Sequence, residues 1–376
     1  MPLRAFRGLL ALPILLAACG TPSVAPPAPE PTPEATPEPT PEPTPEPPSG
    51  VSVSDVSGGV CEATGFDRLT DGRVVVTDAG RADSVSVFSA EGLAKGTSSP
   101  VKLSFKSMEG PLPETIEDLA AVASRGDRLV LVGSFAHEEG GACLIPEHRA
   151  KILVGDAGGG EIEWENRLRM KPCAWSGAGE NCPDGVLPVL DSVESCKEAL
   201  FTSKITTQGP TVCESLVKAE AAIKGGTCGP GFAVAAATIV TGRAGNKLWI
   251  ALRSPLTVAN ETILLRLEQP VEELSKLSFD RASYIGLPAG YEIRGLATEG
   301  NTILGVADGA DGGMLFSFSA RDLRDGDAVN ATPSDVEIPA GVQAVSSGLT
   351  GPVALFGGQA SASGCDRKSQ VGEVPR

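Results

Sequence analysis

Short apolar runs, each preceded by a turn rich in Gly, Asp or Asn, recur along the chain. Runs of this length between turn residues are typical of β-strands and hairpins rather than of helices. The turns and the runs after them are Asp71-Gly72-Arg73 with Val74–Thr77, Gly126-Asp127-Arg128 with Leu129–Gly133, Gly245-Asn246-Lys247 with Leu248–Leu252, Gly300-Asn301-Thr302 with Ile303–Val306, and Gly351-Pro352 with Val353–Phe356. A second apolar run follows four of them, at Ser84–Phe88, Lys151–Val154, Thr262–Leu267 and Met314–Ser319.

The marker glycines of these turns are 54, 119, 55 and 51 residues apart. The long interval shrinks to 63 residues when the 56 residues from Cys173 to Cys228 are treated as an insertion. A period of roughly 50 residues with several strands per unit is the signature of propeller blades. We therefore predict an all-β fold, a β-propeller of five to seven blades, over residues 51–376. A two-sheet sandwich is the competing architecture, which the fixed period disfavours.

The insertion at residues 173–228 has a different pattern. Val189–Ser203 and Val212–Lys224 carry Leu, Val and Ala at helical spacing, with Glu and Lys between them. We predict two short helices, held by disulfides, on one face of the ring. Such an insertion serves either as a lid or partner surface or as a simple cap.

The first residues predict export and lipidation. Arg4 and Arg7 precede an apolar stretch, Leu9–Leu16, that is far shorter than the about 20 residues of a membrane-spanning helix. Such a stretch fits a secretory signal. Leu16-Ala17-Ala18-Cys19 then resembles the lipobox of bacterial lipoproteins, in which the Cys thiol receives a diacylglycerol and becomes the first residue after cleavage. The alternative is an ordinary secretory signal with an incidental Cys.

The resemblance implies a signal peptide at residues 1–18 and a membrane partner reached through lipid on Cys19. Gly20 follows Cys19 where the inner-membrane retention signal has Asp, so the outer membrane is favoured. Residues 19–50 form a Pro/Glu/Thr-rich linker, with Thr-Pro-Glu-Pro repeated from Thr36 to Pro47. Because proline fixes φ and removes donors, this linker is expected to stay extended and to reach on the order of 90 Å.

The chain has nine cysteines, and an even number of eight remains once Cys19 is assigned to lipidation. An even number in an exported chain predicts up to four disulfides. The eight are Cys61, Cys143, Cys173, Cys182, Cys196, Cys213, Cys228 and Cys365. Cys61 and Cys365 lie at opposite ends of the domain, where a disulfide between them would lock the ring. A zinc site is the alternative, but the chain has no C-x₂-C pair and no His between Cys173 and Cys228.

Composition narrows the function classes. The formal net charge is −16 and aromatic residues make up 4% of the chain, so we predict no nucleic-acid partner. The two histidines, His137 and His148, are too few for a His-rich metal cage. We predict no cofactor, with Ca²⁺ as the exception under the catalytic alternative below.

Three segments in order resemble a known family. They are Gly59-Val60-Cys61-Glu62-Ala63-Thr64-Gly65, then Ile116-Glu117-Asp118-Leu119-Ala120 followed by Gly126-Asp127-Arg128-Leu129 and Gly133-Ser134, and finally Ile293-Arg294-Gly295-Leu296-Ala297. Their order is similar to that of the bacterial family called domain of unknown function 3616, over residues 59 to about 320. The resemblance implies a propeller-like fold and brings no established activity.

The chain departs from that family in two ways. Phe135 stands where the family usually has His, with His137 two residues later. The basic tract that follows in the family is reduced to Arg149 and Lys151, and Glu138 and Glu139 lie in its place. If the family binds an anion through that basic tract, we do not expect this chain to do so through the same segment.

Polar residues just upstream of the marker turns are the candidate site. Glu62, Glu117, Asp118 and Arg294 occupy equivalent places in their repeats, and Ser134 joins them through the Gly133-Ser134 motif. Because loops gather polar groups at one mouth of a propeller channel, we expect these residues to converge there. Converging carboxylates would suit Ca²⁺ or proton transfer. Alternatively, Arg294 pairs with Glu117 or Asp118 to satisfy polar groups in the channel.

Three functions remain open from the sequence. The first is a non-catalytic, lipid-anchored propeller of the cell envelope that binds a protein or a small-molecule ligand. The second is a Ca²⁺-dependent hydrolase, lactonase- or phosphoesterase-like, with Glu62, Glu117 and Asp118 as ligands or bases. The third is a purely structural envelope component.

Overall fold

The computed structural model describes ten ranges of the chain, and all structural statements below refer to them. They are residues 51–107, 110–136, 148–158, 161–169, 192–201, 209–224, 232–324, 326–348, 351–361 and 364–375. Several predictions concern residues outside the described ranges. These residues are the lipidated Cys19, the linker after it, His137, Cys143, Cys173, Cys182 and Cys228.

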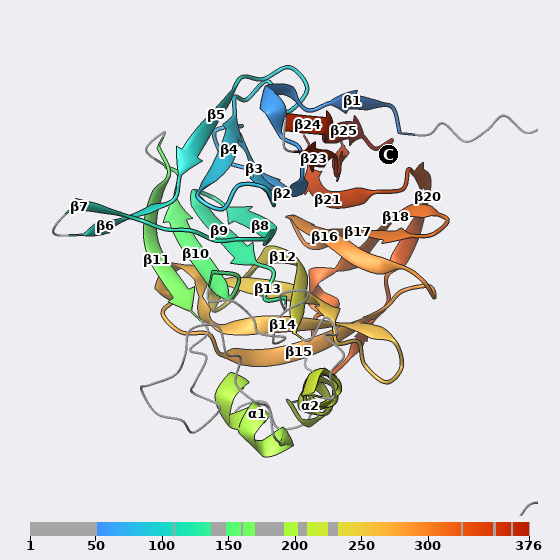
Figure 1. Cartoon of the computed structure of the whole chain (residues 1–376). Coiled ribbons are helices and arrows are strands. Elements are labelled where there is room, and N and C mark those ends of the chain that lie inside the picture. The colour runs from blue at the N-terminus through green and yellow to red at the C-terminus, as the bar shows by residue number, and fades with distance from the viewer. Residues whose placement is uncertain are drawn as a thin grey trace, which may run out of the picture. The chain divides into compact units, whose positions relative to one another are not determined.

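Five sheets, each with four antiparallel strands at its centre, form the five blades of a β-propeller (Figure 1). This confirms the predicted fold class and sets the number of blades at the lower end of the expected range. Blade 1 consists of β2 (Ala63–Arg68), β3 (Val74–Asp78), β4 (Ser84–Phe88) and β5 (Ser98–Lys102). Blade 2 consists of β8 (Leu119–Arg125), β9 (Arg128–Gly133), β10 (Lys151–Asp156) and β11 (Glu163–Arg169), extended by β6 (Ser104–Ser107) and β7 (Gly110–Pro113).

The other three blades follow the same order from the innermost strand outwards. Blade 3 consists of β12 (Ala233–Gly242), β13 (Gly245–Ser254), β14 (Glu261–Pro270) and β15 (Phe279–Gly286), with the short β19 (Ala328–Val329) at its edge. Blade 4 consists of β16 (Glu292–Glu299), β17 (Thr302–Gly309), β18 (Gly312–Ser319) and β20 (Thr332–Ile338). Blade 5 consists of β21 (Val342–Ser347), β22 (Pro352–Phe356), β25 (Gln370–Glu373) and β1 (Val53–Asp55).

The innermost strands close a ring. β2, β8, β12, β16 and β21 each contact the next in this order, and β21 contacts β2 again. Each marker turn of the sequence is the hairpin between the innermost and the second strand of one blade. Gly72, Gly126, Gly245 and Gly300 in these hairpins have positive φ, which glycine adopts without steric cost. The repeat in the sequence is therefore the repeat of the blades.

The first and last strands meet in blade 5. β1 pairs with β25 in antiparallel register, so the N-terminal strand completes a sheet built otherwise from the C-terminal end. Between β22 and β25 lies the hairpin of β23 (Gln359–Ser361) and β24 (Gly364–Arg367). Cys365 of β24 forms a disulfide with Cys61, with 5.2 Å between the two Cα atoms. The predicted bond between the ends of the domain is thus confirmed.

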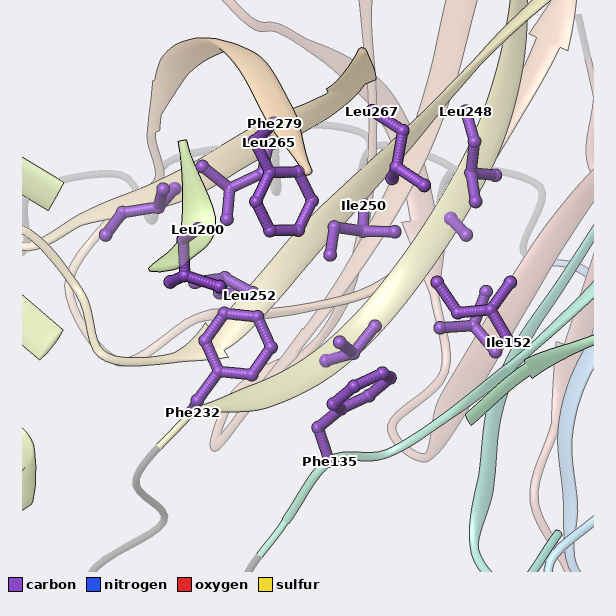
Figure 2. Close-up of a cluster of buried hydrophobic side chains, with 14 of the residues drawn as sticks. Phe135, Ile152, Leu200, Phe232, Leu248, Ile250, Leu252, Leu265, Leu267 and Phe279 are labelled. Carbon is purple, nitrogen blue, oxygen red and sulfur yellow. The ribbon is translucent and has the colours of Figure 1, made fainter. Parts of the chain in front are cut away.

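The core consists of five apolar clusters, one between each pair of neighbouring blades. Along β9, Leu129 and Leu131 face blade 1, whereas Val130 and Val132 face blade 3. A strand buried on both faces reads as a continuous apolar run, which explains the runs after the marker turns. Figure 2 shows the cluster between blades 2 and 3, in which Phe135 and Phe232 meet edge to face.

Two helices of the insertion pack against blade 3. They are α1 (Val193–Leu200) and α2 (Gly209–Lys224), close to the predicted ranges, and a Cys196–Cys213 disulfide joins them. Leu200 and Leu216 enter the same apolar cluster as the strands of blade 3, and α2 contacts the outer strand β15. Three short 3₁₀ helices complete the described elements, at Ser57–Gly59, Val271–Glu273 and Ala320–Asp322. None of the described helices is both long and apolar enough to cross a membrane.

Candidate functional site

Every innermost strand carries a β-bulge near its first residues. The pairing of each strand with the second strand of its blade skips one residue there, and the skipped residues are Thr64, Ala120, Ala235, Arg294 and Gln343. A bulge leaves its residue out of the ladder and re-aims the side chain. Five bulges at equivalent positions therefore form a ring at the mouth where the innermost strands begin, which we call the entry mouth.

Below the entry mouth the central channel is almost closed. Its cavity measures about 10 Å³ and is lined by residues that include Gly65, Ala121, Ala236 and Gly295. A Cβ added to Gly295 would lie 2.6 Å from the Cα of Ala344 on the neighbouring strand, closer than real Cβ atoms approach. Small residues thus let five strands come together, and the space left suits at most about one water molecule. Any ligand of this ring must bind at the mouth rather than inside the channel.

Arg294 is the charged member of the bulge ring. Its Nη2 atom pairs with Oε2 of Glu292 at 3.0 Å, on the same strand. Its Nε atom is buried and has no hydrogen-bond partner. The predicted pairing of Arg294 with Glu117 or Asp118 is therefore wrong, since the partner in the structure is Glu292. One donor of the guanidinium group remains unused at the mouth.

Arg253 lies beside Arg294 at the end of β13, at a second irregularity of blade 3. Ala233 pairs with Ser254 and Val234 with Leu252, so Arg253 is skipped by the ladder. Within the described residues its side chain makes no hydrogen bond and no ion pair, although Arg294, Glu292 and Asp118 act on its charge. The guanidinium group is open to solvent at its surface but surrounded by protein on its other sides.

The electrostatics of Arg253 reflect this position. Burial lowers the pKa of the Arg253 guanidinium, and the positive charge of Arg294 lowers it further. Glu292 and Asp118 act in the opposite direction but do not cancel the shift. The positive charge of Arg294 therefore acts on Arg253 at the entry mouth and is incompletely compensated by nearby carboxylates, although the whole chain carries a formal charge of −16.

The predicted carboxylates Glu117 and Asp118 lie at the same mouth, before β8. Glu117 is half exposed, and its Oε2 atom lies 2.7 Å from Nε2 of His148. Asp118 has a positive φ of 55°, and its carbonyl oxygen accepts a hydrogen bond from the Ser134 amide. Of the two, only Asp118 acts on the arginine pair.

Glu62 belongs to a different cluster at the start of blade 1. Its backbone amide donates to Oδ1 of Asp78 at 3.3 Å, and the amide of Cys61 donates to Oδ2 at 3.1 Å. Gly80 also donates to Oδ1 of Asp78, at 3.0 Å. Asp78 is buried, so its carboxylate organises the turn that carries the Cys61–Cys365 disulfide. This role belongs to Asp78, which the sequence analysis did not single out.

Ser134 is buried and links blades 2 and 3. Its carbonyl oxygen accepts a hydrogen bond from the amide of Val234 at 2.7 Å, and its hydroxyl accepts one from the amide of Ala136 at 3.2 Å. These bonds hold the end of β9 to the start of β12. They give Ser134 a structural role at the mouth.

The structure thus brings together part of the predicted set. Arg294 and Asp118 lie in one electrostatic cluster with Arg253 and Glu292, whereas Glu62, Glu117 and Ser134 are engaged elsewhere. Among the described residues, no three His, Cys, Asp or Glu side chains come together as a metal site.

The sequence did not mark Arg253 as a site residue, because a charged residue directly after an apolar run usually just ends a strand. In β13, Leu252 and Ser254 pair with consecutive residues of β12, so Arg253 between them is left out of the pairing. This bulge is visible only in the strand register. An arginine directly after the buried run Leu248–Leu252 was the signal available in the sequence.

Comparison with known proteins gives matches of low similarity. No protein-family profile matches the sequence, and no curated protein sequence matches it. Among solved structures, a nidogen/laminin complex aligns with 9% identity over 79% of this chain and 73% of that one, at a TM-score of 0.37. The Dos1 propeller aligns with 9% identity over 81% and 69%, at a TM-score of 0.31.

A virginiamycin B lyase from Staphylococcus aureus aligns with 11% identity, over 82% of this chain and 81% of that one, at a TM-score of 0.32. At such identities the likeness concerns the fold and transfers neither an activity nor a ligand. The assignment as a five-bladed propeller comes from the strand order and the closed ring of innermost strands.

Proposed function

We propose that this protein is a lipid-anchored propeller of the cell envelope that binds an anionic group of a ligand or partner at the entry mouth. The observation that carries the proposal is the Arg253–Arg294 pair, in which Nε of Arg294 and the whole Arg253 side chain lack partners within the described residues. Guanidinium groups bind carboxylate and phosphate oxygens through parallel N–H donors.

An anion between the two arginines relieves their mutual repulsion. The Arg253 guanidinium is partly removed from water, and the positive charge of Arg294 disfavours its charged form further. A bound carboxylate or phosphate supplies the acceptors and the negative charge that Glu292 and Asp118 provide only in part. The negative net charge of the protein repels anions at long range. An anion is therefore held at this mouth by the local arrangement of the two arginines, and long-range attraction does not contribute.

Inorganic phosphate is a suitable first probe. Millimolar phosphate should raise the melting temperature of the wild-type protein above that in sodium chloride of equal ionic strength, since a ligand that binds only the folded state stabilises it. R253Q and R294Q should lose this shift. R321Q removes the same charge from the exposed Arg321 in the 3₁₀ helix Ala320–Asp322 and should keep the shift.

Equal phosphate shifts in the wild type, R253Q and R294Q would overturn the anion-binding proposal. So would the absence of any shift in the wild type up to the solubility of phosphate. Both outcomes leave the propeller fold untouched, because that fold follows from the sheet topology alone.

Export and lipidation form the second part of the proposal. They are supported by the apolar stretch Leu9–Leu16, the Leu16-Ala17-Ala18-Cys19 sequence and the proline-rich linker that follows it. In a bacterial host, the wild type should partition into detergent with a mass gain on a peptide starting at Cys19, and C19A should not. A wild-type chain that is exported but carries no lipid would contradict the anchor.

The Ca²⁺-dependent hydrolase requires a set of convergent oxygen ligands. Glu117 is engaged with His148, and among the described residues no three His, Cys, Asp or Glu side chains come together as a metal site. For this reason the binding module is the function that we put forward.

A further inference from the structure

A second hollow of the protein lies at the opposite end of the ring from the entry mouth. It is a groove of about 820 Å³ between blades 5 and 1, which we call the seam groove. It lies at the ends of β2 and β21, beside the loop at residues 90–95 and the last residues of β25. Its volume is within the range of small-molecule sites.

The seam groove has an apolar lining with a few polar groups. Its apolar lining includes Phe66, Val74, Leu93, Val353, Val371 and Val374. Phe66, Val74 and Leu93 also belong to the apolar cluster between blades 5 and 1, so the groove lies directly beside this packing. Lys95, Glu91 and Glu373 stand exposed at its edge and contribute little net charge.

Arg68 is the cation in the wall of the seam groove. Its Nη1 atom donates to the carbonyl oxygen of Gly72 at 3.1 Å, which fixes one end of the guanidinium group. Its Nε atom is buried without a partner, and Nη2 makes no hydrogen bond or ion pair within the described residues. The neighbouring Asp67 does not compensate it, because the Asp67 carboxylate accepts its bonds from the Ser346 and Ser124 side chains and from backbone amides.

The same chain shows what this edge of a guanidinium group binds when it is occupied. In blade 3, Nε and Nη2 of Arg266 donate to the two carboxylate oxygens of Asp280, each at 2.8 Å. Arg68 offers the same two donors, already held in place by Gly72, but without a carboxylate. A buried donor without a partner is unfavourable, so a group that satisfies it gains affinity.

We propose that the seam groove binds an amphiphilic carboxylate, with the carboxylate on Nε and Nη2 of Arg68 and the apolar body along Phe66, Val74, Val353 and Val371. Because Nε is buried, the proposal requires the guanidinium group to turn toward the ligand while Nη1 keeps its bond to Gly72. The site is separate from the entry mouth, since it lies at the other end of the innermost strands, and it does not depend on the Arg253–Arg294 pair.

Dodecanoate is the probe, used below its micelle concentration and titrated into the full-length mature protein by calorimetry. Dodecanol carries the same chain without the charge and should bind at least about 10-fold more weakly, because it cannot form the paired charged hydrogen bonds. R68Q should weaken dodecanoate binding about 10- to 100-fold and leave dodecanol binding unchanged. R321Q should bind dodecanoate as the wild type does.

A variant that fills the groove separates the site from other apolar surfaces. Ser347 lines the groove at the end of β21, so S347F should weaken dodecanoate and dodecanol together while the melting temperature stays near that of the wild type. Unfolding of R68Q is checked by its melting temperature, and R68K retains the charge without the paired donors and should resemble R68Q.

The proposal is overturned if wild-type protein binds dodecanoate and dodecanol equally, if R68Q binds dodecanoate as the wild type does, or if S347F binds both as before. Absence of dodecanoate binding to the wild type overturns it as well. The phosphate shift at the entry mouth is read out separately, so the two proposals fail independently.

Discussion

Two sets of charged groups in the same ring differ in how completely their hydrogen bonds are made. At one end of β2, Asp67 connects three blades: Oδ1 accepts from the Ser346 hydroxyl at 2.9 Å, and Oδ2 accepts from the Ser124 amide and hydroxyl at 2.6 and 3.0 Å. At the entry mouth, Arg253 has no such bond and Arg294 keeps an unused Nε. The first arrangement fastens blades to one another, and the second leaves donors free.

This difference separates structural from functional charges. A buried charged group with all its hydrogen bonds made is an integral part of the fold, and its removal leaves its partners unpaired. A guanidinium group without partners contributes little to folding and remains ready for a ligand. The predictions below test the contrast from the largest expected effect to the smallest.

The largest effect is expected at the buried ion pair of blade 2. Nζ of Lys151 lies 2.5 Å from Oε1 of Glu114, and both side chains are almost wholly buried. K151M should lower the free energy of unfolding by about 3–5 kcal/mol, because it leaves the Glu114 carboxylate buried without its cation. Urea denaturation followed by circular dichroism measures the change.

The double variant K151M/E114L is the control for this pair. It removes both charges, so it should recover most of the stability that K151M loses. A double variant as unstable as K151M would show that packing rather than the unpaired charge causes the loss.

D67A should come next, with a loss of about 2–3 kcal/mol. The substitution leaves the amides of Ser124 and Arg68 without acceptors and breaks the link between β2, β8 and β21. T238V is a matched comparison, since it removes only the 2.8 Å bond between the Thr238 and Thr298 hydroxyls of blades 3 and 4. A loss in D67A no larger than in T238V would contradict the role given to Asp67.

The same carboxyl group makes a pH prediction. Burial raises the pKa of Asp67 above its ordinary value of 3.8, although its hydrogen bonds oppose the shift. Between 3.8 and the raised value the folded state keeps the proton that the unfolded state has lost, so stability falls as the pH rises through this window. The stability difference between wild type and D67A should therefore shrink with rising pH across it. A difference that grows instead would show that the pKa is lowered.

The sequence predicted the ring well because the blade repeat is local. Each marker turn needs a glycine with positive φ, as at Gly72 and Gly245, and each following run is apolar because it packs on both faces. The turn glycine and the apolar run after it lie within about ten residues of each other in the sequence. Five copies were visible once the insertion was set aside, which gave a range of five to seven blades, and the structure has five.

R253Q should change stability by no more than about 0.5 kcal/mol, in contrast to D67A. Arg253 has no partner to lose within the described residues, and its removal relieves the repulsion with Arg294. Thermal denaturation in the absence of phosphate measures the effect. A loss comparable to that of D67A would show that Arg253 has a structural role.

Calcium should have the smallest effect. Millimolar Ca²⁺ should leave the melting temperature unchanged, and a chelator should not lower it, since Glu117 is engaged with His148 and the described residues bring no three carboxylate, His or Cys side chains together. A rise with Ca²⁺ that E117Q abolishes would restore the hydrolase alternative.

The site was predicted less well than the ring, for a physical reason. Arg294 lies in a recognisable sequence context, but its neighbour Arg253 comes from the adjacent blade and is re-aimed by a bulge. The Glu117 carboxylate pairs with His148, and the Glu62 backbone amide bonds to Asp78, contacts that the sequence does not encode locally. Side-chain pairing across blades depends on register, and a shift of one residue changes which groups meet.

An anomalous-scattering experiment tests the central claim most directly. Crystals grown with selenate should show an anomalous peak within hydrogen-bond distance of the guanidinium groups of both Arg253 and Arg294, and crystals of R253Q should lack it. A map with selenate elsewhere on the protein and none at the entry mouth, or an equal peak in R253Q, would contradict the account.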